Sequence, residues 1–164
     1  MTELAKLSSE RLQDNLMDVT KLLDKHKLVA TMMHSQKEPR HELVEALVLR
    51  QQLAELRTRL NKLHIADIAY ILEAMPHEDR ILIWQQIQPF NRGDVLLEIS
   101  DSARPSLIAA MNEEQLKDAL KGLAPDDLNL LAGDLSPDVL DHVRAGLTRE
   151  DRKWMDTTLR YEQG

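Results

Sequence analysis

The feature that most constrains the fold is an apolar residue that returns every twelve positions through the last two thirds of the chain. This series, called here the beat residues, begins at Leu63, and a second series eight positions after each beat is also apolar throughout. The beat residues are Leu63, Met75, Ile87, Ile99, Met111, Leu123, Leu135, Leu147 and Leu159. The second series is Ile71, Ile83, Val95, Leu107, Ala119, Leu131, Val143 and Met155. The fold must therefore bury two positions in each unit.

A period of twelve does not suit one continuous helix, because the apolar stripe would rotate by roughly 120° at each repeat. Prolines follow several beat residues by one or two positions, where they suit the first turn of a new helix: Pro76, Pro89, Pro125 and Pro137. Each unit is thus predicted to be one helix of about eight residues and a tight turn, too short to be stable alone. Consecutive units must stack into a solenoid, whose hand the repeat leaves open. A merged, longer helix is the alternative around residues 92–111, where Pro105 lies inside a unit.

The first third of the chain predicts two longer helices. One runs from about Ser9 to Met33 and the other from about His41 to Lys62, separated by a polar stretch that contains Pro39. Their apolar faces repeat at helical spacing: Leu12, Leu16, Val19 and Leu23 in the first, and Leu49, Leu53, Leu56 and Leu60 in the second. Aromatic residues make up only 3% of the chain, which favours helices over strands. Trp84 and Trp154 are expected in core or groove packing.

Composition excludes several classes of function. The chain has no cysteine, so it can hold neither a disulfide nor a thiolate metal site, and a cytoplasmic setting fits best. No apolar run approaches the roughly 18 residues of a transmembrane helix, and the first residues do not form a signal peptide. Residues 1–62 carry a net charge of +2 and residues 63–164 a net charge of −9. Nucleic acid is therefore an unfavourable partner, whereas cations and basic surfaces are favoured.

Several segments resemble the N-terminal cytoplasmic domain of the MgtE family of magnesium transporters. They are LHIADIA from Leu63, LEAMP from Leu72, GDVLLE from Gly93, the L-x-P-D beats at Leu123 and Leu135, and RYE from Arg160. The resemblance covers about residues 42–164. With it, the predicted fold class is all-α, a right-handed superhelix (solenoid) of short helices preceded by two longer helices. The predicted parts are an N-terminal helical extension (1–40), an MgtE-like superhelical domain (41–160) and the start of a linker towards absent CBS domains (161–164).

The resemblance implies a function. In that family an acidic N domain precedes a pair of CBS domains, a connecting helix and a membrane pore, and magnesium between the N and CBS domains keeps the pore closed. The chain is thus expected to be the cytoplasmic magnesium-sensing domain of an inner-membrane transporter that is a homodimer when full-length. Magnesium suits acidic faces, because it takes oxygen ligands, keeps several waters and needs only one or two carboxylates from each side.

The resemblance also places candidate site residues. Asp94 and Asp126 fall where family members use a carboxylate for an interdomain ion, and Asp127 is a lesser metal ligand. The candidate partner-binding residues are Asp94, Asp126, Asn129 and Asp134, with Asn129 standing where the family can offer a further acid. For Asp126 and Asp127 the structural alternative is equally simple, since acids in a first turn complement the helix dipole.

Enzymatic chemistry has no motif in the sequence, because a glycine-rich phosphate loop and a nucleophile elbow are both missing. The six histidines lack ligand spacing, and His64 is expected at a cap or on the surface. The chain is therefore predicted not to be an enzyme. The alternative function is a helical-repeat scaffold or adaptor that binds a protein partner, similar to flagellar-motor switch proteins.

Overall fold

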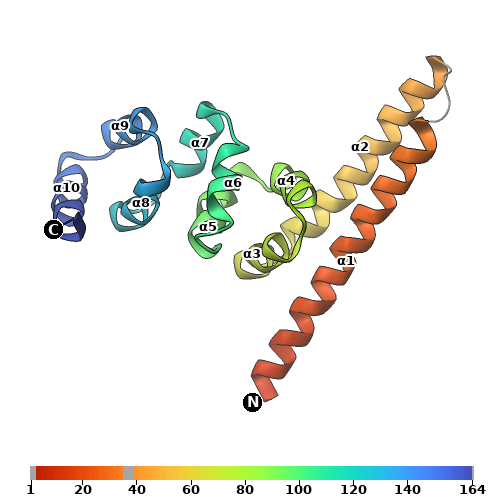
Figure 1. The fold of residues 1–164 in the computed structure, drawn as a ribbon, viewed down its shortest axis with the longest axis horizontal. Helices are drawn as coiled ribbons and strands as arrows, with labels where there is room; N and C mark the ends of the chain where they lie inside the picture. The colour runs from red at the N-terminus through yellow and green to blue at the C-terminus, as the bar shows by residue number, and fades with distance from the viewer. Residues whose placement is uncertain (1–2, 35–38, 164) are drawn as a thin grey trace. The chain divides into compact units, whose positions relative to one another are not determined.

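The structure, a computed structural model, describes residues 3–34 and 39–163. Every regular element in these residues is a helix (Figure 1). This confirms the predicted all-α class. The chain divides into two compact units, Met1–Ile87, called here the N unit, and Gln88–Gly164, called the C unit. None of the described helices is both long and apolar enough to cross a membrane.

The N unit begins with a helical hairpin. Helix α1 (Glu3–His34) and helix α2 (Pro39–Asn61) lie side by side (Figure 1). Their ends differ from the predicted ones by one or two residues, except that α1 starts six residues before Ser9. The hairpin buries the predicted faces towards their C-terminal halves, at Val19 and Leu23 in α1 and at Leu56 and Leu60 in α2.

Two short helices complete the N unit, α3 (Ile65–Ala74) and α4 (His77–Gln86). Helix α3 packs on α1, and α4 packs on α2 and on α3. Their contribution to the core is apolar, with Ile71, Leu72, Ile83 and Trp84 at most 1% exposed. The first two twelve-residue units therefore share a core with the N-terminal hairpin. The core position expected for Trp84 is confirmed.

Ion pairs tie the hairpin to these short helices. Asp67 is only 2% exposed, and its Oδ1 lies 3.3 Å from Nη2 of Arg11 on α1. Nζ of Lys27 lies 2.6 Å from Oδ1 of Asp79, at the start of α4. The hydrogen bond and the charge of Asp79 raise the pKa of Lys27 above its ordinary value of 10.5. Ion pairs as well as apolar packing thus join the hairpin to α3 and α4.

The C unit is a succession of short helices. They are α5 (Pro89–Glu98), α6 (Arg104–Ala109), α7 (Glu113–Leu120), α8 (Pro125–Leu131), a 3₁₀ turn η1 (Ala132–Asp134), α9 (Pro137–Ala145) and α10 (Arg149–Gln163). Helices two places apart in the sequence pack together, since α5 contacts α7, α7 contacts α9 and α8 contacts α10. This stacking is compatible with a solenoid, but the strongest contacts join each helix to the one two units further along, and not to the consecutive unit that the sequence predicts. The right-handed sense of the superhelix stays a prediction.

The twelve-residue period sets the places of the helices. Beat residues from Leu63 to Leu147 lie in the turns between helices or at helix ends, and the second series lies inside helices or at their C-terminal ends. In the second series, Val143 is half-buried and the other seven members are buried. The beat residues are buried or half-buried as far as Leu147, whereas the side chain of Leu159 lies outside the described ones. Each period of twelve residues therefore corresponds to one helix and one turn.

Arginine side chains close several helix C-termini in a way that the apolar pattern does not reveal. Arg80, Arg104 and Arg152 stand five residues after a beat residue. Each donates hydrogen bonds from Nε to the carbonyl eight residues earlier and from Nη2 to the carbonyl of the beat residue itself. The last carbonyls of a helix lack donors within the helix, and such a side chain supplies them.

The alternative of a merged helix around residues 92–111 is wrong. Helix α5 ends at Glu98, and α6 begins only at Arg104, with Pro105 in its first turn. Nε and Nη2 of Arg104 bind carbonyls at the end of α5. These bonds satisfy the carbonyls at a point where a continuous helix would have used backbone N–H groups.

Candidate functional site

Asp94, the first candidate metal ligand, lies in the second half of α5 with its side chain exposed. The residue before it fixes how α5 packs. A Cβ atom on Gly93 would overlap the carbonyl oxygen of Ala119 on α7, so the two helices approach closely only because this residue has no side chain. Among the described residues Asp94 has no ion-pair partner. Its carboxylate is therefore presented to solvent on a firmly packed helix.

Asp126 and Asp127 lie in the first turn of α8, directly after Pro125. Helix α8 has no side-chain cap, so the two carboxylates are the charges that complement its free N–H groups. The structural role considered for them in the sequence is thus available in the fold. Asp126 is exposed and Asp127 is half-buried. Neither of them forms an ion pair with a described residue, so their charge is not neutralised by a side chain of the described part.

Trp154 does not occupy the core, which was one of the two positions expected for it. Its side chain on α10 is 57% exposed, and its indole Nε1 donates a 2.6 Å hydrogen bond to Oδ1 of Asp126. Tryptophan combines an apolar body with an N–H donor, which can find a partner at a hydrated surface. The bond fixes one oxygen of the Asp126 carboxylate.

Asn129 and Asp134 have different surroundings. Asn129 is only 6% exposed, and neither its Oδ1 nor its Nδ2 has a hydrogen-bond partner among the described residues. Such burial gives a partner little access to Asn129. Its role in partner binding stays a prediction, and its low exposed fraction does not favour that role. Oδ2 of Asp134 on η1 lies 3.5 Å from Nη1 of Arg104 and its side chain is 30% exposed. Asp134 is therefore engaged in a contact within the C unit.

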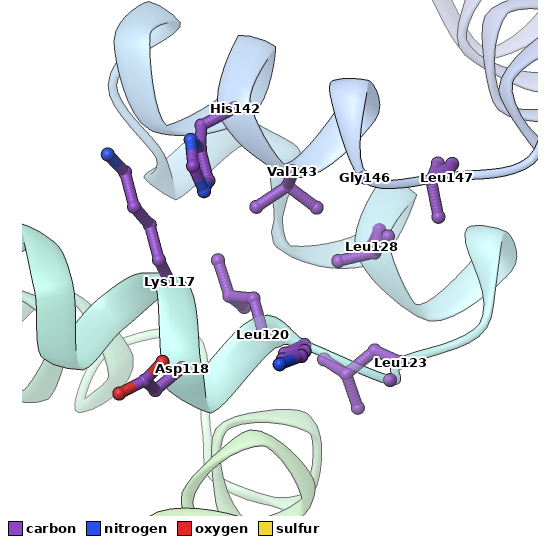
Figure 2. Close-up of a pocket in the computed structure, with 11 residues that line it drawn as sticks. Lys117, Asp118, Leu120, Leu123, Leu128, His142, Val143, Gly146 and Leu147 are labelled. Atoms are coloured by element: carbon purple, nitrogen blue, oxygen red, sulfur yellow. The ribbon is translucent and has the colours of Figure 1, made fainter.

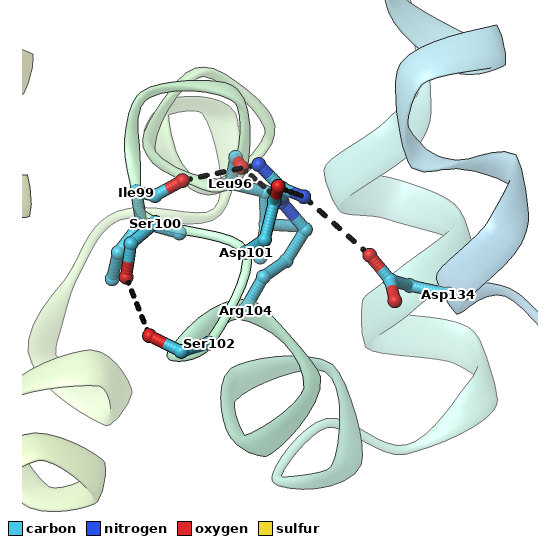
Figure 3. A network of polar contacts seen from close by, with 7 residues as sticks. All are labelled: Leu96, Ile99, Ser100, Asp101, Ser102, Arg104 and Asp134. Carbon is cyan, nitrogen blue, oxygen red and sulfur yellow. Dashed lines mark hydrogen bonds and ion pairs between the residues drawn. The ribbon is translucent and has the colours of Figure 1, made fainter.

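Arg104 is the centre of a polar network that the sequence analysis missed (Figure 3). Its guanidinium is buried, with Nε 2.8 Å from the carbonyl oxygen of Leu96 and Nη2 3.0 Å from that of Ile99. Nη1 also donates to Asp101 at 2.7 Å. The signal that could have found this residue is the arginine five positions after a beat, which recurs at Arg80 and Arg152.

The described residues contain no group of three or more His, Asp or Glu side chains that could hold a metal ion. Asp126 and Asp127 are neighbours in one turn, whereas Asp94 is on another helix and Asp134 is paired with Arg104. The oxygen donors present still fit magnesium chemically, because this ion retains most of its waters and takes one or two carboxylates from a protein surface. The site residues predicted from the sequence stay predictions.

Comparison with known proteins identifies a family. The model of the family described as "MgtE intracellular N domain" matches residues 63–164, and no curated protein matches the chain. The match begins at Leu63, where the twelve-residue period begins. This family comprises regulatory domains of magnesium transporters and is not an enzyme family. Because the match covers more than half of the sequence, the chain belongs to the family of MgtE intracellular N domains.

Proposed function

We propose that this domain senses magnesium and regulates a magnesium-transporting pore by docking, in a magnesium-dependent way, on CBS domains of the same polypeptide. On this proposal the domain lies on the cytoplasmic side of the inner membrane, and the complete transporter is a homodimer. Family membership gives the regulatory role in magnesium transport, and the finer mechanism rests on the acids of the C unit.

The observation that carries the proposal is the set of carboxylates without cationic partners on the C unit. Asp94 and Asp126 are exposed, and neither they nor Asp127 form an ion pair with a described residue. Residues 88–164 contain fifteen acidic and nine basic residues, a net charge of −6. Such a surface repels another acidic surface until a divalent cation lies between them.

Magnesium then acts as a ligand of the docked state alone. When bound, the ion would supply positive charge and octahedral coordination between the two surfaces. Asp94 on α5, or Asp126 with Asp127 on α8, would hold this domain's side of such an ion, and the Trp154 hydrogen bond leaves Oδ2 of Asp126 for the ion or its waters. Because the ion binds the docked arrangement more tightly, its concentration shifts the population towards that arrangement.

The experiment compares small-angle scattering curves of a protein that carries this domain together with a CBS pair, at low and at high magnesium. We expect the radius of gyration to fall as magnesium is added. Asp94→Asn and Asp126→Asn, alone and together, should raise the magnesium concentration at the midpoint of the change. Asp138→Asn is the matched control, because Asp138 is also an exposed acid after a proline in a first turn.

Equal effects of Asp126→Asn and Asp138→Asn would reject the assigned ligands, and curves that do not respond to magnesium would reject the sensor mechanism.

A second candidate function, a scaffold that binds a protein partner, is favoured by one observation. Large apolar side chains stand on the surface of the C unit, with Phe90 75% and Leu130 66% exposed. Docking that is tight in the absence of magnesium and lost in Leu130→Ser would favour this second function.

A further inference from the structure

A pocket of about 270 Å³ lies inside the C unit, where α7, α8 and α9 meet. Its lining is largely apolar. Leu120 and Leu128 are at most 1% exposed, and Val143 and Leu147 are half-buried (Figure 2). An apolar pocket of this kind is a place where a small ligand can gain binding energy by leaving water.

Two glycines in turns line the pocket. Gly122 follows α7 with φ of +88°, a conformation that favours glycine, and no atom lies within 4 Å of the position that a Cβ would take. Gly146 ends α9 and also lines the pocket. Neither glycine adds a side chain to the volume beside Leu123 and Leu147.

The charge at this pocket is opposite to that of the unit that contains it. Lys117, Lys121 and His142 line it, in a unit with a net charge of −6. Figure 2 shows Lys117 and His142 together at one end, Leu147 at the other, and the carboxylate of Asp118 pointing away from the apolar side chains. The pocket therefore has a basic end and an apolar end.

The two lysines remain able to bind an anion. Lys121 is exposed and forms no ion pair with a described residue. Nζ of Lys117 lies 3.0 Å from Oε1 of Glu113, which is 59% exposed. An ammonium group has three donors, so Lys117 can keep this pair and still bind a second carboxylate.

We propose that this pocket binds a small amphipathic monocarboxylate, with its alkyl chain against Leu120 and Leu128 and its carboxylate at Lys117, Lys121 and His142. The volume sets the size of the ligand. A water molecule in the liquid takes about 30 Å³, so a pocket of about 270 Å³ has room for about nine groups of that size, and a carboxylate at its open end can extend beyond it. Octanoate has ten heavy atoms and both chemical features. This site is independent of the magnesium proposal, since none of the candidate metal ligands lines the pocket.

The test is a titration of the isotopically labelled chain with octanoate, followed by amide chemical shifts. We expect saturable shifts confined to residues 117–123, 128 and 142–147, with a dissociation constant on the order of 1 mM for so small a ligand. Octylammonium is the matched ligand, with the same chain and the opposite charge. The net charge of the whole protein favours the cation, so tighter binding of octanoate would identify the basic end of the pocket as its cause.

Variants separate the two halves of the proposal. Lys117→Gln with Lys121→Gln should weaken octanoate about three- to tenfold, the effect of losing partly exposed charge-assisted contacts. Val143→Phe should abolish binding by filling the pocket from a half-buried position, while the spectrum stays that of the folded chain. Lys153→Gln, an exposed lysine of α10, is the control and should change nothing. Shifts outside these residues, an equal loss in Lys153→Gln, tighter octylammonium binding, or no saturation by either ligand would each overturn the proposal.

Discussion

Replacing Arg104 by methionine tests whether arginines that bind helix-end carbonyls hold the repeat together. Methionine keeps an unbranched apolar side chain but removes every donor of the guanidinium. The change leaves the carbonyls of Leu96 and Ile99 without their side-chain donor. Both hydrogen bonds are buried, and their lengths of 2.8 and 3.0 Å are those of good N–H···O bonds.

The magnitude follows from these two bonds. A hydrogen bond from a charged group contributes about 1.5–3 kcal/mol when buried, and water reaches some of the freed carbonyls, so we expect a loss of about 3 kcal/mol. The ion pair with Asp101 adds little, because the side chain of Asp101 is 96% exposed. Arg152→Met is the matched control. Its two bonds are exposed and longer, at 3.2 and 3.4 Å, so a loss of about 0.5 kcal/mol or less is expected there.

Amide hydrogen exchange measured by NMR is the suitable assay, because it reports the free energy of opening helix by helix, whereas a single unfolding free energy need not describe a chain of two compact units. The free energy of opening should fall in α5 and α6 of Arg104→Met and stay unchanged in α1 and α2. Asp101→Asn should behave like the unaltered protein. The reasoning would be refuted if the losses in free energy of opening in Arg104→Met and Arg152→Met agreed within about 0.5 kcal/mol. Leaving two buried carbonyls without a donor would then cost no more than leaving two exposed ones.

Two further predictions concern packing and charge. Gly93→Ala should lower the free energy of unfolding of the C unit by about 1–3 kcal/mol, because the new Cβ meets the backbone of α7; Gly133→Ala, where a Cβ meets nothing within 4 Å, is the control, and equal urea midpoints would contradict the close approach. The pKa of Lys27 is raised in the folded chain by Asp79, so this pair stabilises the N unit at pH values below the ordinary lysine pKa of 10.5 and the stabilisation is lost as pH rises through the raised value. Lys27→Met should therefore reduce the fall in the free energy of unfolding that occurs at alkaline pH. Lys25→Met should not reduce it, because its partner Glu55 lies 3.8 Å away.

The helices could be predicted from the sequence because their signals are local. Prolines in first turns, glycines at helix ends and cap residues act within one turn of themselves. The capping box of α7 is an example, since Asn112 and Gln115 satisfy each other's backbone N–H groups across three residues. The twelve-residue period then fixed where each short helix lies, and the family match begins where that period begins.

The roles of individual polar residues could not be predicted in the same way. Asp67 and Asp126 both stand in the first turn of a short helix, yet one is 2% exposed beside Arg11 and the other is exposed beside Trp154. Asn129 looked like a substituted ligand in the sequence and is buried in the structure. The apolar period says which positions face inward and gives no information about which distant side chain meets a polar one.

The sequence by itself determined that this chain is helical, that its short helices follow a period of twelve, that its last two thirds are acidic, and that it resembles the family to which it belongs. Only the tertiary structure decided which acids are held by partners, that Arg104 is buried at the end of α5, and that α7, α8 and α9 leave an apolar pocket with a basic end. The physical reason is range. Helix signals act between residues a few positions apart, whereas Trp154 meets Asp126 across 28 positions and Arg11 meets Asp67 across 56, and such contacts exist only once the helices have packed.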